Sequence, residues 1–454
     1  MNATRRFTGL AVLLALCLAL GGAASVYGQA PAAGGQDQGA GKQPYTMAEY
    51  NSYKACADDK VPASQIKCLD DFVSKYPNSA LLIYIYPLYY QAYGTQKNYA
   101  KVIENADKLI ALGDKVEAPI RLQAYNVRLG AWTTLPAADQ TAGAAAARDA
   151  ATKALKTLDE IKKPDNVSDA DFAKSKQPYV IFFNNTGAQA STLLKDSAGA
   201  MTFYKAILSI NPDEPVTHYN MGKAYLAMNP PKQLDAFWSI AKAITSKAAT
   251  EPQKKQLTPY LKKLILAYQG GTVCDSLSDS EFNELLQLAG SSADRPESYK
   301  ILSAADLDAA RKDMTIASVI TDLKAGGDKA KVTWFASCGL EFPDVPGKLL
   351  EVTPGATPAD PVVLKLAFVT NQAEFDAATT PNMEVKIAGQ PEAGKLEKDS
   401  APRFTGTLET YDPDPAFMLH WDKAKVNAED LPKEKPGTTK KPPVRKPAPK
   451  KPSQ

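Results

Sequence analysis

The amino-acid sequence predicts a mostly α-helical chain that ends in a small β domain and a disordered tail. Between Thr46 and about Leu323, apolar and small residues recur at helical spacing, and short Pro, Gly and Asn stops interrupt them. From about Lys331 the chain has short, partly alternating stretches that are typical of strands. The last segment, 433–454, has six prolines and one large apolar residue, Val444, so it cannot bury enough surface to offset the entropy of ordering.

Length and composition fit a globular protein with an unevenly distributed charge. The chain has 454 residues, of which 44% are hydrophobic, enough for two or three domains with a sizeable core. The formal net charge is +3, but 433–454 alone holds seven lysines, one arginine and one glutamate. The body is therefore mildly acidic and carries a basic tail. We expect this tail to contact an anionic envelope surface; the alternative is a tail that only aids solubility.

The N-terminus has the layout of a secretory signal peptide, which we assign to 1–28. Arg5 and Arg6 precede an apolar run, Leu10–Leu20, and small residues follow it. This run is too short to span a membrane, and we expect no transmembrane segment in the mature chain. Residues 29–44 are rich in Gly, Ala and Gln and are expected to form a flexible linker. The mature protein is therefore expected to be exported, either periplasmic or secreted.

Export changes how the cysteines are interpreted. Cys17 belongs to the signal, which leaves Cys56, Cys68, Cys274 and Cys338 in an oxidising compartment. An even number favours two disulfides. Three pairings are possible, and proximity in sequence favours Cys56–Cys68 together with Cys274–Cys338. The alternative is four reduced, buried thiols. A zinc site is not expected, because paired short spacings and nearby histidines are missing from the sequence.

The expected helical domain, 45–328, carries recognisable helix starts. Capping boxes stand at Thr46–Glu49, Ser278–Glu281 and Ser303–Asp306. In such a box the hydroxyl accepts from a free backbone N–H while the acidic side chain reaches back to the start of the helix. Each box therefore predicts that a helix begins there.

A cluster of five tyrosines lies between Tyr84 and Tyr93. Tyrosines at helical spacing pack between helices and leave their hydroxyls near water. We therefore expect this cluster to belong to the helix contacts. The alternative is a platform for a ligand.

Two stretches of the helical domain repeat one pattern 35 residues apart. Gly187 and Gly222 occupy equivalent places, and Phe183 or His218 stands four residues before each glycine. A second helix follows each glycine, with small residues spaced against aromatic ones. These residues are Ala200, Phe203 and Ala206 in the first unit and Ala236, Trp238 and Ala243 in the second. The two helices of each unit are therefore predicted to approach closely.

This pattern resembles the tetratricopeptide repeat (TPR), a helical hairpin in which small residues stand where the two helices touch and which recurs with a period near 34. The match is best over 180–246 and extends to 77–112, whereas 115–160 and 251–325 share only the period. The "YPNSA" opening is similar to that of TPR proteins of the bacterial cell envelope. The resemblance implies an α-solenoid of TPR-like hairpins.

The resemblance also implies a partner-binding groove lined by the first helix of each hairpin. Carried over position by position, the groove residues are Tyr219, Lys223 and Leu226 in one repeat and Asn184 and Ser191 in the one before. The expected occupant is an envelope protein or peptide. The sequence lacks the full Lys/Asn pattern of the carboxylate-clamp subclass, so a chaperone tail is not implied.

The small β domain is expected at 329–432. Its strand-like stretches read "GKLLEVTP", "PVVLKLAF", "MEVKIAG", "RFTGTLETY" and "AFMLHW". They resemble an OB-type barrel, a fold that binds oligonucleotides or sugars or mediates contacts. Because these stretches lack a stripe of aromatic and basic residues, nucleic acid is not an expected partner.

Few residues of the sequence suggest catalysis. The chain has two histidines, which nearly excludes histidine-dependent triads and histidine-rich metal sites. His218 falls on an inward-facing position of the repeat and His420 on a predicted strand, so both are expected to be structural. Asp412 and Asp414 in "YDPDP" could hold a cation, but Asp-Pro pairs favour a hairpin turn. We expect no catalytic residue, no cofactor and no metal site.

Two functional hypotheses follow from the sequence. The favoured one is an exported, non-catalytic TPR scaffold that mediates protein–protein interaction in the bacterial envelope. The alternative is an enzyme, or a protein that binds cell-wall material or oligosaccharides, acting through the C-terminal β domain. The shortage of catalytic residue types favours the scaffold.

Overall fold

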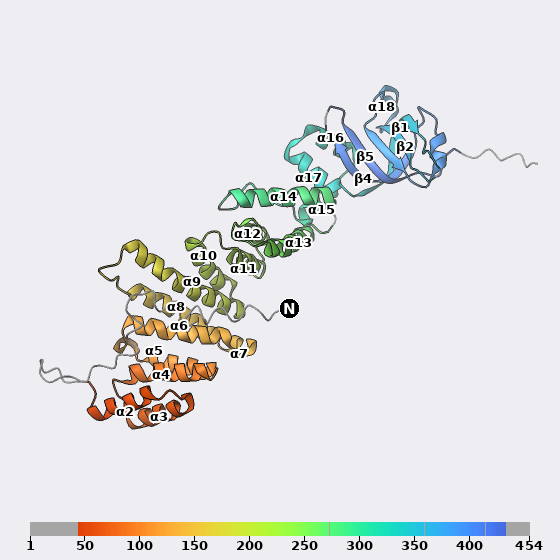
Figure 1. Ribbon diagram of the computed structural model, residues 1–454. Coiled ribbons are helices and arrows are strands. Elements are labelled where there is room, and N and C mark those ends of the chain that lie inside the picture. Colours follow the sequence, from red (N-terminus) through yellow and green to blue (C-terminus); the bar gives the residue numbers. More distant parts are fainter. Residues whose placement is uncertain (1–43, 272, 358, 414, 433–454) are drawn as a thin grey trace, which may run out of the picture. The chain divides into compact units, whose positions relative to one another are not determined.

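The structure is a computed structural model that describes residues 44–432 except 272, 358 and 414. The expected signal peptide, nearly all of the expected linker, the basic tail and Asp414 lie outside the described residues. The described part is mostly helical and ends in a five-stranded barrel (Figure 1), which confirms the predicted fold class.

Helices occupy most of the chain up to Ser337. They are α2 (Met47–Asp58), α3 (Pro62–Lys75), α4 (Leu82–Thr95), α5 (Tyr99–Ala111), η2 (Gly113–Lys115), α6 (Ala118–Thr134), α7 (Ala137–Ala142), α8 (Ala144–Glu160), α9 (Asp169–Leu193), α10 (Ser197–Ile210), α11 (Pro215–Leu226), α12 (Gln233–Thr245), α13 (Glu251–Tyr268), α14 (Asp275–Ser291), α15 (Ala304–Arg311), α16 (Ile316–Ala325) and α17 (Gly327–Ser337).

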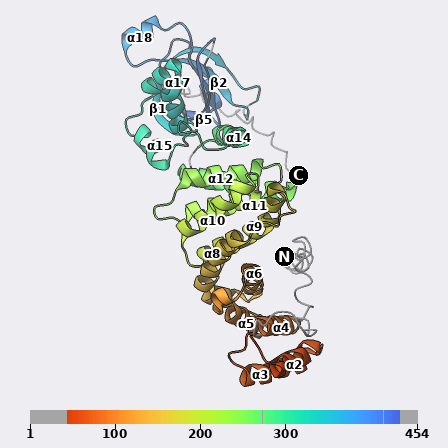
Figure 2. The same cartoon turned by 90° about the vertical axis from the view of Figure 1, so that its left-hand side faces the viewer.

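Two compact units divide the chain. The first reaches Leu261 and also contains Leu285–Pro296, whereas the second contains Lys262–Glu284 and the described residues from Glu297 onward. In the first unit, successive helical pairs stack on one another from α2/α3 to α11/α12 (Figure 2). Among the described residues, we find no helix that combines the length and the apolar character needed to cross a membrane.

Two of the three expected capping boxes are present. Glu49 N donates to Thr46 Oγ1 over 3.2 Å, and Thr46 N donates back to Glu49 Oε2 over 2.6 Å. Ser303 and Asp306 form the same pair at the start of α15. The box expected at Ser278–Glu281 was wrong, because α14 begins earlier, at Asp275, and Glu281 is buried and bonds elsewhere.

One turn recurs between the helices of two hairpins. After α4, Lys97 has φ 57° and Asn98 N donates to Tyr93 O over 2.9 Å; after α9, Lys195 has φ 59° and Asp196 N donates to Ser191 O over 2.9 Å. The side chains of Asn98 and Asp196 then cap α5 and α10. The same backbone device therefore reverses the chain in two separate hairpins.

Glycines set the closest approach within two hairpins. A Cβ atom on Gly187 of α9 would lie 2.6 Å from the Phe203 ring of α10, and one on Gly222 of α11 would lie 2.7 Å from Ile240 of α12. Real Cβ atoms do not tolerate such contacts, so each glycine allows its helix to pack against the next.

Alanines serve the same purpose farther along the first unit. Helix α8 is fully buried along a stripe that faces its neighbours α6 and α9. That stripe consists of Ala144, Ala147, Ala151 and Ala154, each 0% exposed. Side chains this small let the helix axes approach, and Leu129, Trp132 and Phe183 fill the remaining space in the same core.

The tyrosines between Tyr84 and Tyr93 contribute to these helix contacts. Tyr89 and Tyr90 are each 5% exposed, and Tyr89 Oη donates to Asp70 Oδ1 on α3 over 2.7 Å. The expectation that this cluster packs between helices is confirmed for these two residues.

The four remaining cysteines pair as the sequence favours. Cys56 is bonded to Cys68, with a Cα–Cα distance of 5.4 Å, and links α2 to α3. Cys274 is bonded to Cys338, with a Cα–Cα distance of 5.8 Å, and links the start of α14 to the residue after α17. Both disulfides lie within one compact unit each.

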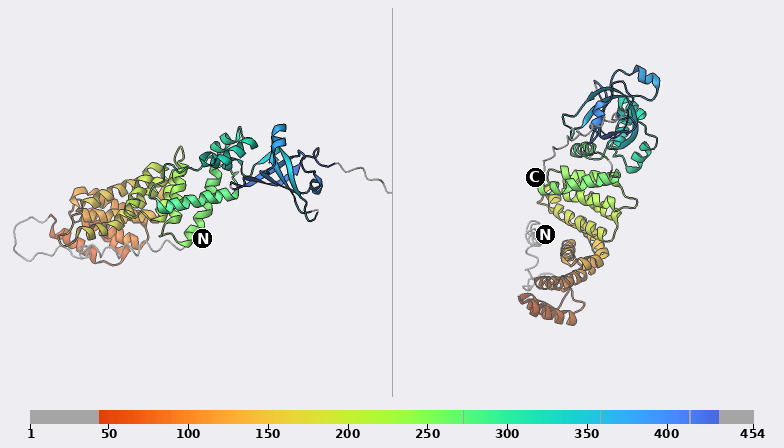
Figure 3. Two further views of the ribbon diagram at one scale, coloured as in Figure 1. Left: turned by 90° about the horizontal axis from the view of Figure 1, so that it is seen from above. Right: turned by 90° about the vertical axis from the view of Figure 1, so that its right-hand side faces the viewer.

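The strands of the second unit gather in one small domain (Figure 3) and form a closed barrel, whose strand order is β1-β2-β3-β5-β4. They are β1 (Glu341–Thr353), β2 (Val362–Phe368), β3 (Met383–Ile387), β4 (Arg403–Asp412) and β5 (Met418–Val426). All pairings are antiparallel except β3 with β5. The long β1 pairs with both β2 and β4, which closes the barrel.

Alternation along the strands builds the interior of the barrel. Leu349, Leu364, Val385 and Leu408 are each 0% exposed, while their neighbours along the strand point outward. Short α18 (Gln372–Ala377) and η3 (Pro391–Lys395) lie in the connections. The first residues of the segment expected to be β, from 329 onward, are helical in the structure, and the first strand begins at Glu341.

Candidate functional site

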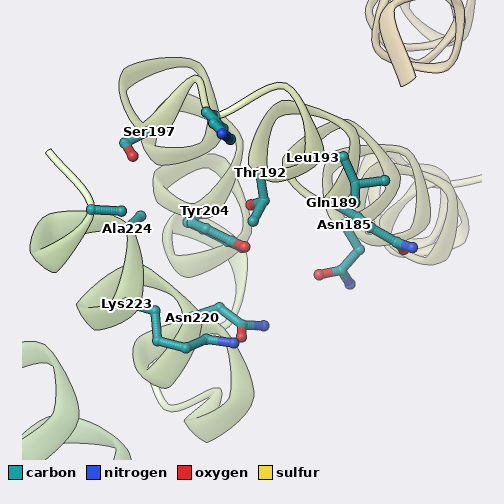
Figure 4. Close-up of a pocket in the computed structure, with 11 residues that line it drawn as sticks. Asn185, Gln189, Thr192, Leu193, Ser197, Tyr204, Asn220, Lys223 and Ala224 are labelled. Atoms are coloured by element: carbon teal, nitrogen blue, oxygen red, sulfur yellow. The ribbon is translucent and has the colours of Figure 1, made fainter. Parts of the chain in front are cut away.

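A pocket of about 670 Å³ lies among α9, α10 and α11 (Figure 4). Its walls come from three consecutive helices of the first unit, two of which carry the interface glycines Gly187 and Gly222. Gly187 allows α9 to pack closely against α10 and so helps to set the distance between two of these walls.

Three amide side chains line this pocket. Asn185 and Gln189 stand one helical turn apart on α9, and Asn220 stands on α11. Asn185 and Asn220 each precede an interface glycine by two residues, so they occupy equivalent places in the two repeats. Each amide carries both a donor and an acceptor, which is the pair of groups that a peptide backbone requires. Gln189 Nε2 already donates one hydrogen bond, to Gln140 Oε1 over 2.9 Å.

Two lysines bring positive charge to the pocket. Lys195 occupies the turn after α9, with φ 59°, and Lys223 follows Asn220 by one turn of α11. The Lys223 Nζ atom lies 4.8 Å from the centre of the Tyr219 ring, which in turn lies edge-on to Tyr260 with centroids 6.2 Å apart. The lysine is thereby held by a cation–π contact at the edge of the site.

The lining residues include no carboxylate. Asp196, between the lining residues Lys195 and Ser197, bonds elsewhere. Its Oδ2 atom accepts from Arg148 Nη1 over 2.8 Å, and its Oδ1 atom accepts from Gly199 N over 2.8 Å. Asp196 therefore does not compensate the lysine charges in the pocket.

Tyr204 of α10 lies between the amide-bearing walls (Figure 4). Its side chain is 6% exposed, and burial raises the pKa of its phenol above the ordinary value of 10.0, while a hydrogen bond with Thr192 acts in the opposite direction. The hydroxyl therefore stays neutral at physiological pH and can both donate and accept.

Of the five residues that were expected to line the groove, some lie at the pocket and others are buried in the core. Lys223 lines the pocket, Tyr219 holds it there, and Leu226 is partly buried beside the lining residue Ala227. Asn184 and Ser191 are 3% and 0% exposed and do not reach the pocket. Asn184 Nδ2 instead donates to Val180 O over 2.7 Å within α9.

The residues that replace these two are their immediate neighbours, Asn185 and Thr192. One residue along a helix turns the side chain by about 100°, so an error of one position moves it from the surface into the core. The "Asn-x-Gly" spacing shared by the two repeats is the sequence signal that would have identified Asn185 and Asn220.

His218 is a core residue, as expected. It is 6% exposed, its Nε2 atom bonds with Pro212 O over 2.8 Å, and burial lowers the pKa of the imidazole below 6.5. The neutral ring therefore donates to the carbonyl and joins the start of α11 to the turn before it.

His420 also has a structural position, on the outer side of β5. Its Nε2 atom lies 2.9 Å from Asp412 Oδ2 and its Nδ1 atom lies 3.4 Å from Glu384 Oε1. The ring thus links β5 to both of its neighbours, β4 and β3. Across the described ranges, we find no group of three or more His, Cys, Asp or Glu side chains arranged to hold a metal ion.

Comparisons with protein-family models, with curated proteins and with solved structures found no match for this chain. The features that indicate a function are therefore the geometry of the helical hairpins and the chemistry of the pocket that they form.

Proposed function

We propose that this chain is an exported, non-catalytic scaffold of the TPR type that binds a partner protein in the bacterial envelope. The α9–α11 pocket would hold an extended, acidic segment of that partner. One observation carries the proposal: the pocket combines three amides and two lysines with no lining carboxylate.

The placement of the amides suits an extended peptide. Asn185 and Asn220 stand at equivalent places on neighbouring hairpins and both line the pocket, so one extended segment lying in the pocket would meet both amides with its backbone groups. Lys195 and Lys223 would then bind acidic side chains of the same segment.

The lining groups suit binding better than catalysis. Amides and ammonium groups donate hydrogen bonds and neutralise charge, whereas general acid–base catalysis needs a group that titrates near the working pH. Burial moves the pKa of Tyr204 farther from neutrality, which removes the phenol as a base.

Export is supported by the cysteines. Pairing of Cys56 with Cys68 and of Cys274 with Cys338 fits an oxidising compartment. The expected signal peptide at 1–28 would deliver the chain there, and the expected occupant would be an envelope protein.

A function through the barrel is less well supported. Trp334, Tyr411 and Phe417 form a half-buried aromatic group, but Trp334 packs edge-on against Tyr411 with centroids 4.8 Å apart. These contacts hold α17 to the barrel, so packing already accounts for the presence of the three rings. The alternative of an enzyme or an oligosaccharide-binding protein therefore stands second.

Charge-removing substitutions test the proposed site. Fluorescence anisotropy would follow a labelled, Asp-rich peptide binding to the wild-type protein and to the Lys195→Gln/Lys223→Gln double variant. We expect the double variant to bind at least about 10-fold more weakly, because each lost charge-assisted hydrogen bond is worth about 1.5 kcal/mol or more.

Lys97→Gln is the matched control, because Lys97 occupies the same turn in another hairpin, with φ 57°, and lies outside the pocket. It should bind the peptide as the wild type does. Equal binding by the wild type and the double variant would remove the pocket from the proposed function.

A further inference from the structure

A buried carboxyl group lies in the second unit. The side chain of Glu281, on α14, is 3% exposed, and Gln269, the residue after α13, is 0% exposed. Gln269 Nε2 donates to Glu281 Oε2 over 2.7 Å. The contact fastens the end of α13 to α14.

The oxygen of the Gln269 amide indicates which protonation state of Glu281 this pair requires. Gln269 Oε1 is buried and has no hydrogen-bond partner within the described part of the chain. Turning the amide over would leave the NH₂ group without a partner and would set its oxygen against a carboxylate oxygen. A charged carboxylate only accepts, so it can satisfy only one end of the amide in either orientation. A neutral carboxyl both accepts and donates, so it can satisfy both ends.

The charged and titratable groups that face Glu281 come from three elements. Lys331 on α17 favours the ionised carboxylate, whereas Glu284, one turn along α14, opposes it. Lys331 Nζ also lies 3.4 Å from Glu284 Oε2, so part of its charge is already compensated. Tyr299, before α15, adds a buried phenol whose pKa is raised by burial and, to a smaller extent, by Glu281.

We infer that the contact between Glu281 and Gln269 depends on a proton bound to the Glu281 carboxyl. In its neutral form the carboxyl closes a two-hydrogen-bond pair with Gln269 and holds the end of α13 to α14. When the proton leaves, one of these bonds is lost and a charge is left buried, so this joint loosens as the solution becomes alkaline.

The direction of the pH effect follows from linkage. Burial is the largest influence and raises the pKa of Glu281 from its ordinary 4.5 to about 7. Between these two values the folded chain holds a proton that the unfolded chain has released. The contribution to stability is therefore complete below about pH 4.5 and is lost as the pH rises through about 7. Over pH 5 to 9 the folding equilibrium constant should fall by roughly 10²-fold through this one group.

The Glu281→Gln variant isolates the contribution of Glu281 to the pH dependence of stability from that of every other titratable group. The amide has the shape of the neutral carboxyl, can exchange two hydrogen bonds with Gln269, and does not titrate. Denaturant unfolding of the full-length wild type and the variant would be measured from pH 5 to 9. We expect the ratio of their folding constants to fall between 10-fold and 100-fold over this range. Glu341→Gln, at an exposed residue of β1 that takes no part in this cluster, should keep the wild-type dependence. Parallel pH profiles for the wild type and Glu281→Gln would overturn the inference.

A second measurement covers the case in which Glu281→Gln does not fold. Carbon-13 NMR of the glutamate carboxyls in the wild-type protein would follow Glu281 directly. A midpoint near pH 7 is expected, and a midpoint at the ordinary glutamate value would overturn the inference without any variant.

Discussion

At the residue scale, a single glycine determines how closely α11 and α12 pack. In Gly222→Ala, the new methyl group would lie 2.7 Å from the buried Ile240 and 3.1 Å from Ala236 O, so side chain and backbone must both shift. We expect unfolding to become easier by about 1–3 kcal/mol, even though alanine is the better helix former. Gly94→Ala is the control, because the nearest atom there is 4.0 Å away. It should be neutral or stabilising, and equal losses in both variants would contradict the close-packing argument; chemical denaturation measures both.

The individual side chains that line the pocket were also the feature that the sequence predicted least well. The periodicity identified the first helix of each repeat correctly, yet Asn184 and Ser191 proved to be buried while their neighbours line the pocket. A helical pattern defines a face to within about one residue, and one residue is enough to exchange core and surface. Tyr204 was missed for another reason: the TPR resemblance draws the groove from first helices only, and Tyr204 belongs to a second helix.

At the element scale, the turn that recurs between helices contains a strained backbone conformation, which a glycine would relieve. Lys97 adopts φ 57°, a left-handed conformation that costs a side chain roughly 1 kcal/mol and costs glycine little. Lys97→Gly should therefore raise the free energy of unfolding by up to about 1 kcal/mol. Lys101→Gly, inside α5, should lower it by about the same amount, because glycine is a poor helix former there. Thermal unfolding compares the two, and a loss in both would show that the turn is not strained.

Elements were predicted well where a local rule decides them. The five strand-like stretches all overlap observed strands, and two capping boxes begin helices as expected. The box at Ser278–Glu281 failed because burial of Glu281 in tertiary structure overrides a local cap. A lone sequence does not show which acidic side chain of a helix will turn inward, so the Gln269–Glu281 pair was not predictable.

At the scale of the whole molecule, the basic segment 433–454 should be separable from the folded units. Its composition predicts that it contributes no packing, so its deletion should leave the melting temperature unchanged. Binding to anionic vesicles should weaken, and the loss should shrink as salt rises from about 50 to 300 mM. Cosedimentation measures this binding. If full-length and shortened chains bind equally at low salt, the segment is not an electrostatic tether.

We propose that the first unit binds an extended acidic segment in the α9–α11 pocket. The most direct measurement is the affinity of the full-length protein for a labelled Asp-containing peptide and for the same peptide with Asn at every Asp. Because Lys195 and Lys223 line the pocket without a carboxylate, the Asp peptide should bind at least about 10-fold more tightly at low salt, and the preference should fall as salt rises. Equal affinities for the two peptides, or a preference for the neutral one, would contradict the account.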